Sequence, residues 1–261
     1  MRIRKLTSTN AFVAVDLDGV AGRGVVRLAP KILQGGAKNL ARSMTYSLAC
    51  LGRREAGVSA GISVAPEDGE AAVAAFVDEV AGWDDGYRFE AGKGVTPTGL
   101  GSLAVDAGDP LPGAVAAALA ACPGASTAVA DIGDPSPLAG LLADHGVEVL
   151  EADRPLTAAA DLLFVGAGVG AVDHDGADGL GAKVVVPTVR LAVTTRALAT
   201  CSRRGIVVLP DFVVVGLPAD EAAIVVAEVL DHPEGPVLGA CERAEAFLGS
   251  WQDELPFGRP I

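Results

Sequence analysis

The sequence has few aromatic residues and few lysines. Aromatic residues make up 4% of the 261 residues, and five lysines stand beside fifteen arginines. Acidic residues outnumber basic ones by 33 to 20, so the formal net charge is −13. A field of this sign repels the phosphates of nucleic acids and of anionic lipids, so we expect neither nucleic acid nor a membrane as a partner. An acidic, lysine-poor composition also suggests a halophilic or high-GC source.

Cysteines are scarce, and the sequence contains no long apolar run. The four cysteines are far apart and form no C-x-x-C pair, which predicts free thiols in a reducing compartment. The apolar run at 11–15 is too short for a signal peptide or a membrane span. We therefore expect a cytoplasmic protein. Half of the residues are hydrophobic, which excludes global disorder and allows a sizeable core.

The pattern of apolar residues changes along the chain. Residues 11–16 and 23–28 are typical of strands, and the spacing of apolar residues predicts a helix over 35–52. A stretch rich in Gly, Asp and Thr follows at 82–101. Beyond it, short apolar runs alternate with alanine-rich helical segments, which is typical of a parallel sheet covered on both faces. The predicted strands there are 103–107, 127–132, 147–150, 162–165, 183–187 and 206–210.

These patterns predict an α/β fold in three parts. An N-terminal α/β domain spans 1–97. A doubly wound, Rossmann-like parallel sheet that binds a dinucleotide spans 98–216. C-terminal helices over 217–261 are expected to pack back on the N-terminal domain.

The turn after the predicted strand 103–107 is a candidate phosphate site. Gly108 and Gly113 match the first and last glycines of G-x-G-x-x-G, whose backbone N–H groups meet a pyrophosphate at a helix start. Pro110 stands where the middle glycine belongs and has no N–H. The alternative is an ordinary turn with proline near the first helical position.

Two other strand ends carry candidate cofactor residues. Asp131 lies 23 residues beyond Gly108, near the spacing of roughly 20 for the acid that binds a ribose diol and favours NAD over NADP. Gly166 and Gly168 follow strand 162–165 and permit close approach of a ligand to the backbone. The alternatives are a capping or solvent-facing Asp131 and a glycine-rich loop without a ligand.

A rival interpretation comes from the strand that ends in Asp16-Leu17-Asp18-Gly19. This segment resembles the nucleophile motif of haloacid-dehalogenase-type phosphatases, which implies attack by Asp16, acid/base work by Asp18 and a bound Mg²⁺. The lysine and the paired aspartates of those enzymes do not follow in order. A polar turn is the alternative. Elsewhere the sequence predicts no metal site.

Several segments together resemble the glutamate/leucine/phenylalanine/valine dehydrogenase family. The R-G-I-x-x-x-P-D segment at 204–211 and the helical segment at 39–49 are the more specific of them. The resemblance implies a two-part α/β fold whose domain 1–97 is of the dimerisation or substrate type. It also implies NAD or NADP as cofactor, a small-molecule substrate and a homo-oligomer. The segments are 24–30 (GVVRLAP), 39–49 (NLARSMTYSLA), 57–62 (GVSAGI), 98–101 (TGLG), 161–166 (DLLFVG) and 204–212 (RGIVVLPDF).

The departures from this family fall on its chemistry. Ser47 and Ser59 stand where the resemblance places two lysines, one for the substrate carboxylate and one that activates water. Arg27 and Lys38 are then the candidate substrate-binding residues, and Thr98 joins the candidate cofactor residues. The catalytic residues are left unknown.

Two functions remain open at this point. The first is an amino-acid-dehydrogenase-like oxidoreductase that binds NAD or NADP. The second is a pseudoenzyme, a non-catalytic paralogue that binds a nucleotide or a partner subunit. The magnesium-dependent phosphatase with Asp16 and Asp18 is a distant third.

Overall fold

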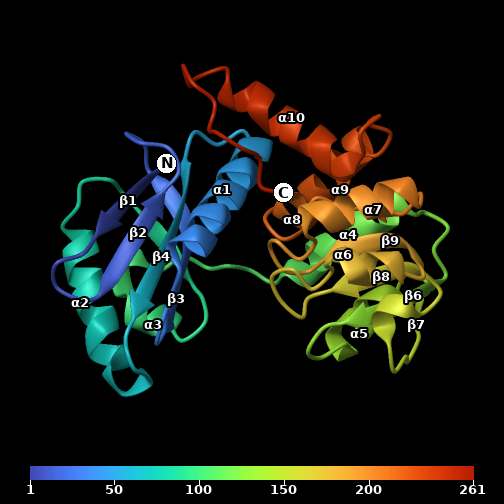
Figure 1. The fold of residues 1–261 in the computed structure, drawn as a ribbon, viewed down its shortest axis with the longest axis horizontal. Coiled ribbons are helices and arrows are strands. Elements are labelled where there is room, and N and C mark those ends of the chain that lie inside the picture. The colour runs from blue at the N-terminus through green and yellow to red at the C-terminus, as the bar shows by residue number, and fades with distance from the viewer. The chain divides into compact units, whose positions relative to one another are not determined.

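A computed structural model describes all 261 residues, and the chain divides into two compact units (Figure 1). Unit 1 comprises Met1–Gly108 and Glu245–Pro260, and unit 2 comprises Asp109–Ala244 and Ile261. Each unit contains one five-stranded sheet with helices, so the α/β fold class is confirmed. None of the helices has the length and apolar character that crossing a membrane requires.

Unit 1 is built on a mixed sheet, sheet A, with strand order β1-β2-β4-β3-β5. Strand β2 pairs antiparallel with β1 and β4, whereas β3 pairs parallel with β4 and β5. The strands are β1 (Arg2–Lys5), β2 (Ala11–Val15), β3 (Gly22–Ala29), β4 (Ala56–Ser63) and β5 (Arg88–Ala91). The helices are α1 (Gln34–Cys50), α2 (Gly69–Ala81) and α3 (Pro97–Leu100), with 3₁₀ turns η1 (Pro66–Asp68) and η2 (Gly101–Leu103).

The two faces of sheet A receive alternate residues of each strand. Val26 of β3 and Val58 of β4 join Phe76 of α2 in one buried cluster. The other face carries a smaller cluster in which Phe12 packs with Ala37 of α1. Because side chains alternate along a strand, the odd-numbered residues of β3 and β4 lie on the α1 face.

Helix α1 lies directly against β4 because Gly57 has no side chain. A Cβ at this position would lie 1.9 Å from the Ala41 carbonyl oxygen and 2.4 Å from the Thr45 nitrogen. The Gly57 N–H donates a 2.9 Å hydrogen bond to the Thr45 hydroxyl, which fixes the contact. The backbones of helix and strand therefore touch at this point.

Unit 2 is built on a parallel sheet, sheet B, with strand order β10-β9-β8-β6-β7. Four consecutive residues of β8 and four of β9 are all buried, so helices cover both faces, as the continuous apolar runs predict. The strands are β6 (Thr127–Asp131), β7 (Glu148–Val149), β8 (Ala160–Val165), β9 (Ala182–Pro187) and β10 (Val207–Val208). The helices are α4 (Pro110–Ala121), α5 (Ser136–Ala143), α6 (His174–Asp178), α7 (Thr195–Arg203), α8 (Asp211–Val214) and α9 (Ala219–Val229), with a 3₁₀ turn η3 (Pro155–Thr157). Helix α10 (Pro236–Leu248) begins in unit 2, and its residues from Glu245 onward are counted in unit 1.

The prediction of a strand of the nucleotide-binding sheet at 103–107 is wrong. Leu103 ends a 3₁₀ turn, and Ala104 forms an isolated bridge with Phe89 of β5, while the Val105 N–H donates to the Phe89 carbonyl at 3.0 Å. This segment therefore extends sheet A. Sheet B begins at β6, and the boundary between the units lies after Gly108. The sequence predicted this boundary after residue 97.

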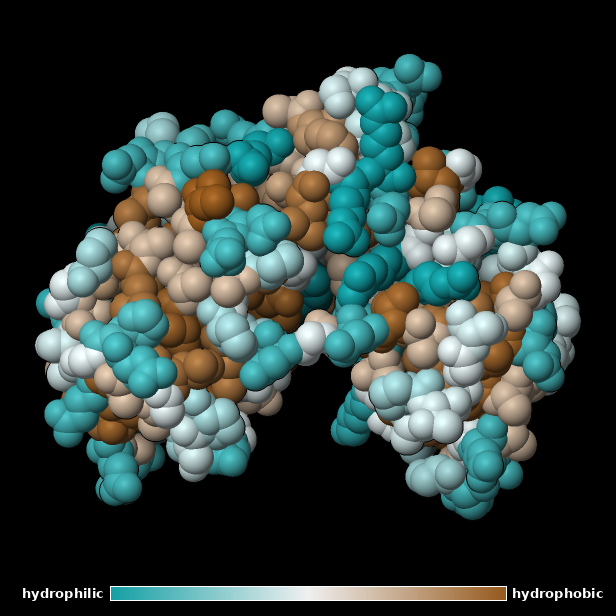
Figure 2. All heavy atoms as spheres, turned by 180° about the vertical axis from the view of Figure 1, so that it is seen from behind, coloured by the Kyte–Doolittle hydropathy of each residue, from teal (hydrophilic) through white to brown (hydrophobic).

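The visible surface mixes hydrophilic and hydrophobic residues. Figure 2 shows hydrophilic residues spread across the visible face, with hydrophobic patches among them. The halophilic source stays a prediction.

At the amino ends of its strands, sheet B is joined by the carboxylate of Asp161. This carboxylate accepts the Ser126 N–H at 2.8 Å, the Thr127 N–H at 3.2 Å and the Lys183 ammonium at 2.8 Å. The hydrogen bond from Lys183, followed by that from the Ser126 backbone, lowers the pKa of Asp161 well below its usual value. Asp161 thus links three neighbouring strands as a charged acceptor.

Replacing Asp161 with Asn should destabilise the protein by about 1–2 kcal/mol at neutral pH, because a charged acceptor of several hydrogen bonds is lost. A lowered carboxyl pKa contributes stability above the unfolded value near 4, and this stability disappears as the pH falls through the folded value. Urea unfolding should therefore give a constant difference between wild type and variant from about pH 5 to 8 and a shrinking one below about pH 4. A difference that grows in acid would contradict the assignment.

Candidate functional site

The crevice expected of a doubly wound sheet lies where the connections diverge. The chain goes from β6 to β7 on one side and then returns to β8 on the other side of β6. Ligands of such sheets bind beyond the carboxyl ends of the strands at this switch point. Asp131 ends β6 and pairs with Val165 of β8, and the Gly166 N–H donates to the Asp131 carbonyl at 2.9 Å. The structure thus brings Asp131, Gly166 and Gly168 to the switch point.

The turn that leads from β6 into α5 supplies few free donors. Its sequence, Asp131-Ile-Gly-Asp-Pro-Ser136, holds one glycine, and Pro135 and Pro137 have no N–H. The Ser136 N–H donates to the carboxylate of Asp134 at 2.9 Å. This backbone bond is the main cause that lowers the pKa of Asp134, so the carboxylate stays ionised at the helix start.

A dinucleotide pyrophosphate does not fit this turn. Such a group needs free backbone N–H donors and a positive potential at the helix N-terminus. Here the Asp134 carboxylate takes the Ser136 N–H, and Asp131 adds a second acid at the end of β6. Asp131 and Ser136 stand where the motif G-x-G-x-x-G has its first and last glycines. The residues at the switch point therefore repel the phosphates of NAD and NADP.

The other predicted cofactor residues lie elsewhere. Thr98 is exposed on α3, and Gly108 ends the first segment of unit 1. The Gly108 N–H is already bound by the carboxylate of Asp106 at 3.0 Å. Gly113 lies within α4, where a Cβ would come within 2.9 Å of the Val214 carbonyl oxygen, so close packing explains this glycine.

Different physical constraints explain the two glycines after β8, Gly166 and Gly168. A Cβ at Gly166 would lie 2.2 Å from the hydroxyl of buried Thr188, so packing against β9's loop requires glycine there. Gly168 has φ of +149° and open space around its Cα, so its backbone conformation accounts for the choice. Only Gly168 leaves room for a ligand.

Sequence reasoning assigned no role to Asp211, which follows β10 at the same edge of sheet B. Its carboxylate accepts the N–H of Leu191, a non-glycine residue with φ of +59°. Burial raises the pKa of Asp211, while the Leu191 N–H and the charge of Arg190 act against that change. The Leu191 carbonyl in turn accepts the Gly170 N–H at 2.8 Å. The loops after β8, β9 and β10 are thus joined by hydrogen bonds within the chain. In the sequence, the Pro210-Asp211 pair of the R-G-I-x-x-x-P-D segment was the feature that could have pointed to this role of Asp211.

In unit 1, the two serines at the lysine positions are sealed. Ser47 is 1% exposed and its hydroxyl donates to the Ser43 carbonyl at 3.2 Å. Ser59 is fully buried, and its hydroxyl has no hydrogen-bond partner. Neither side chain carries a charge or reaches solvent, so neither can hold a carboxylate or take up a proton from water.

The two candidate cations, Arg27 and Lys38, lie on different sides of α1. Arg27 is on β3, and Lys38 is one helical turn before Arg42, which contacts Asp16 at the end of β2. Strand β4 separates β2 from β3. Lys38 is exposed. Arg27 is half-buried, and its Nε atom is buried without a hydrogen-bond partner. Burial alone lowers the pKa of Arg27, and no acidic neighbour contributes.

The Asp16 side chain has a structural role. Arg42 binds both of its oxygens, with Nε at 2.9 and 2.8 Å and Nη2 at 2.7 Å, and the Nη1 of Arg42 donates to the Phe257 and Gly258 carbonyls. Both residues of the pair are buried, whereas Asp18 is exposed. No group of three His, Cys, Asp or Glu side chains is placed to share a metal ion. Asp16 is therefore not available as a nucleophile.

Comparisons with solved structures agree with the fold. An L-tryptophan dehydrogenase from Nostoc punctiforme superposes with a TM-score of 0.72 at 18% identity, over 95% of this chain and 96% of that one. A hetero-hexameric glutamate dehydrogenase from Thermus thermophilus, in a leucine-bound form, gives 0.65 at 20% identity over 92% and 76%. A glutamate dehydrogenase from Peptoniphilus asaccharolyticus gives 0.67 at 14% identity over 94% and 87%.

The chain has the fold of the amino acid dehydrogenases. At these identities the likeness extends to the fold alone. No protein-family model and no curated protein matches the sequence.

The pair of Asp16 and Arg42 should dominate the stability of unit 1. Replacing Arg42 with Met, or Asp16 with Asn, leaves an unpaired buried partner and should cost about 3–5 kcal/mol. The double variant should lose less than the sum of the two single losses, because the partners compensate each other. Urea denaturation measures all three, and an unchanged stability of Asp16→Asn would contradict the structural role.

Proposed function

We propose that this chain is a non-catalytic protein with the amino acid dehydrogenase fold, and that it binds a small carboxylate at Arg27. Arg27 keeps its predicted substrate-binding role, and the chain carries out no hydride transfer. This is the pseudoenzyme alternative of the sequence analysis, with a small acid in place of the nucleotide or partner subunit.

The observation that carries the proposal is the state of the Arg27 guanidinium. A cation that is half-buried and faces no counter-ion has lost hydration without compensation, as the lowered pKa of Arg27 reflects. An anion that pairs with it restores that loss. Arginine also presents a planar fork of donors that matches a carboxylate in two parallel hydrogen bonds.

The loss of the reaction is supported by the two serines and by the turn after β6. Ser47 and Ser59 are buried and neutral, so no side chain at these positions can act as a base at neutral pH. The switch point presents Asp131 and Asp134 to the space where a pyrophosphate would lie. A dehydrogenase without a cofactor site has no acceptor for a hydride.

The neighbours support a ligand of this class and an assembly. The Thermus thermophilus neighbour is a hetero-hexamer and was solved with leucine bound, so the fold accommodates an amino acid and several subunits. We accordingly propose that this chain forms an oligomer. NAD or NADP binding is the competing outcome that titration decides.

Titration calorimetry with NAD, NADP and adenine nucleotides should show no saturable binding at millimolar concentrations, because ionised carboxylates occupy the phosphate position. An active amino acid dehydrogenase run under the same conditions provides the positive control. Saturable binding of NAD or NADP to the full chain would overturn the non-catalytic assignment, even if no turnover followed.

Small 2-oxo acids and amino acids should raise the melting temperature of the wild type, and Arg27→Met should lose this response. The loss of a charge-assisted contact predicts binding weaker by about 10- to 100-fold. Arg27→Met keeps an apolar stem, so its own stability should be unchanged or higher.

Arg23→Met is the matched control for that experiment. Arg23 lies on the same strand and face, but its guanidinium already binds Glu90, with Nε at 3.3 Å, and the Asp106 carbonyl at 2.6 Å. Lys38→Met is a second control on the other side of α1. Both variants should respond to the acids as the wild type does. An Arg27→Met variant that still responds would refute the role of Arg27.

A further inference from the structure

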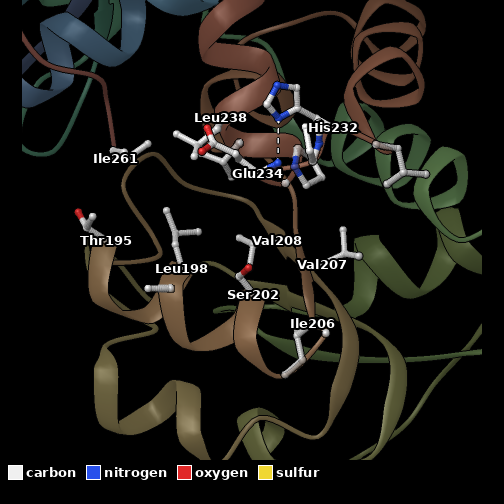
Figure 3. A pocket seen from close by; sticks show the side chains of 17 residues that line it. Thr195, Leu198, Ser202, Ile206, Val207, Val208, His232, Glu234, Leu238 and Ile261 are labelled. Carbon is white, nitrogen blue, oxygen red and sulfur yellow. Dashed lines mark hydrogen bonds between the residues drawn. The ribbon is translucent and has the colours of Figure 1, made fainter.

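A cavity of about 490 Å³ lies in unit 2 beside β10, the edge strand of sheet B. It is bordered by α7, by β10 and by the segment 230–238 that joins α9 to α10. Figure 3 shows Leu198, Ser202 and Val208 on one side of this space, with His232 and Leu238 across from them. The volume falls within the usual range for small-molecule sites.

The lining of the cavity is mostly branched and aliphatic. Its larger apolar side chains are those of Leu198, Ile206, Val207, Leu230, Val237 and Leu238. His232 is the one aromatic polar group there, and both of its ring nitrogens are engaged. Nδ1 accepts the Glu234 N–H at 3.3 Å, so Nε2 carries the proton and donates to Glu242 at 3.2 Å. The ring therefore has no free polar atom for a ligand.

The main chain of Val208 does offer free polar groups. Val207 and Val208 pair with Val184 and Val185 of β9, and the Leu209 N–H donates to the Val185 carbonyl at 3.0 Å. Because N–H groups alternate sides along a strand, those of residues 207 and 209 face β9, and the N–H and C=O of Val208 face the opposite side. The consecutive residues Gly205–Val208 all line the cavity although side chains alternate between the two faces of a strand, so the cavity lies along this outward edge of β10.

This donor and acceptor belong to a buried residue and have no backbone partner. Val208 is 6% exposed, and neither its N–H nor its C=O forms a hydrogen bond to another backbone group outside the sheet. Unpaired backbone groups in a buried residue are rare and costly, and they are satisfied by water or by a ligand. The cavity is thus a mainly apolar space in which the donor and the acceptor of one buried residue lie side by side, while Ser202 and Glu234 add polar side chains.

The available pair suits a small molecule better than an added strand. A peptide strand needs successive outward-facing pairs along the edge. The next outward position toward the N-terminus, Ile206, already donates its N–H to the Cys201 carbonyl at 2.9 Å. The next toward the C-terminus is Pro210, which has no N–H. Only one amide-sized group can pair with this edge.

We propose that the cavity binds a small neutral amide with a branched aliphatic body. The amide carbonyl accepts the Val208 N–H, its own N–H donates to the Val208 carbonyl, and the aliphatic part packs among Leu198, Val237 and Leu238. A neutral group is favoured over a carboxylate because Glu234 lines the cavity and the chain carries a net charge of −13. This site lies in unit 2 and does not depend on Arg27.

The test uses the full chain labelled with ¹⁵N and titrated with 3-methylbutanamide. Saturable shifts of the Val208 amide resonance, with smaller ones at Ser202 and Val237, are the expected result. The matched anion 3-methylbutanoate should shift Val208 at least fivefold less at equal concentration, because it has no N–H to donate and meets Glu234. Shifts that do not saturate, or that centre elsewhere, would overturn the proposal.

Two variants separate the backbone contact from the cavity. Val208→Pro removes the outward N–H while leaving the ladder with β9 intact, since edge strands tolerate proline at such positions. It should weaken binding about fivefold to tenfold, the effect of one hydrogen bond. Leu198 lies half-exposed on α7, and Leu198→Trp should fill the cavity and abolish binding. If Val208→Pro does not fold, this second variant alone tests whether the amide binds in the cavity. Wild-type affinity in either folded variant would refute the site.

Discussion

The close contact of α1 with β4 determines what unit 1 can do. Gly57 lets the helix backbone lie on the strand, and Thr45 locks it there through the Gly57 N–H. This contact buries the α1 face of β4, so Ser59 is sealed with its hydroxyl unpaired. It also brings Arg42 within reach of Asp16. Arg27, one strand further along the sheet, is left half-buried and without a counter-ion.

In unit 2, the chain's own carboxylates bind backbone N–H groups of the loops at the carboxyl edge of sheet B. Asp134 takes the N–H at the start of α5, and Asp211 takes the N–H of Leu191. These bonds satisfy backbone donors at the carboxyl edge of sheet B, and Asp134 places a negative charge there. The excess of acidic residues in the composition thus has a local consequence at this edge. The unpaired donor and acceptor of unit 2 lie instead at Val208, on the open side of β10.

The sequence predicted the fold class and most elements, because burial on one or both faces leaves a period that can be read locally. The continuous apolar runs of β8 and β9 and the helical spacing of α1 are examples. The strand predicted at 103–107 failed because an apolar run does not say which sheet it joins, and this one bridges to Phe89. The candidate cofactor residues stay a prediction, although Gly108 and Gly113 do not lie at the switch point where Asp131, Gly166 and Gly168 do. Gly108 was chosen as the start of the first strand-to-helix turn of the nucleotide fold, whereas that turn follows β6.

The amino-acid sequence by itself determined the acidic composition, the α/β pattern and the loss of charge at Ser47 and Ser59, because each of these depends on residue type or local spacing. The tertiary structure decided which turn lies at the switch point of sheet B, which of Arg27 and Lys38 is desolvated, and that Val208 has an unpaired backbone. These properties follow from strand order and register, which are set by contacts between residues far apart in the chain, and no local pattern carries that information.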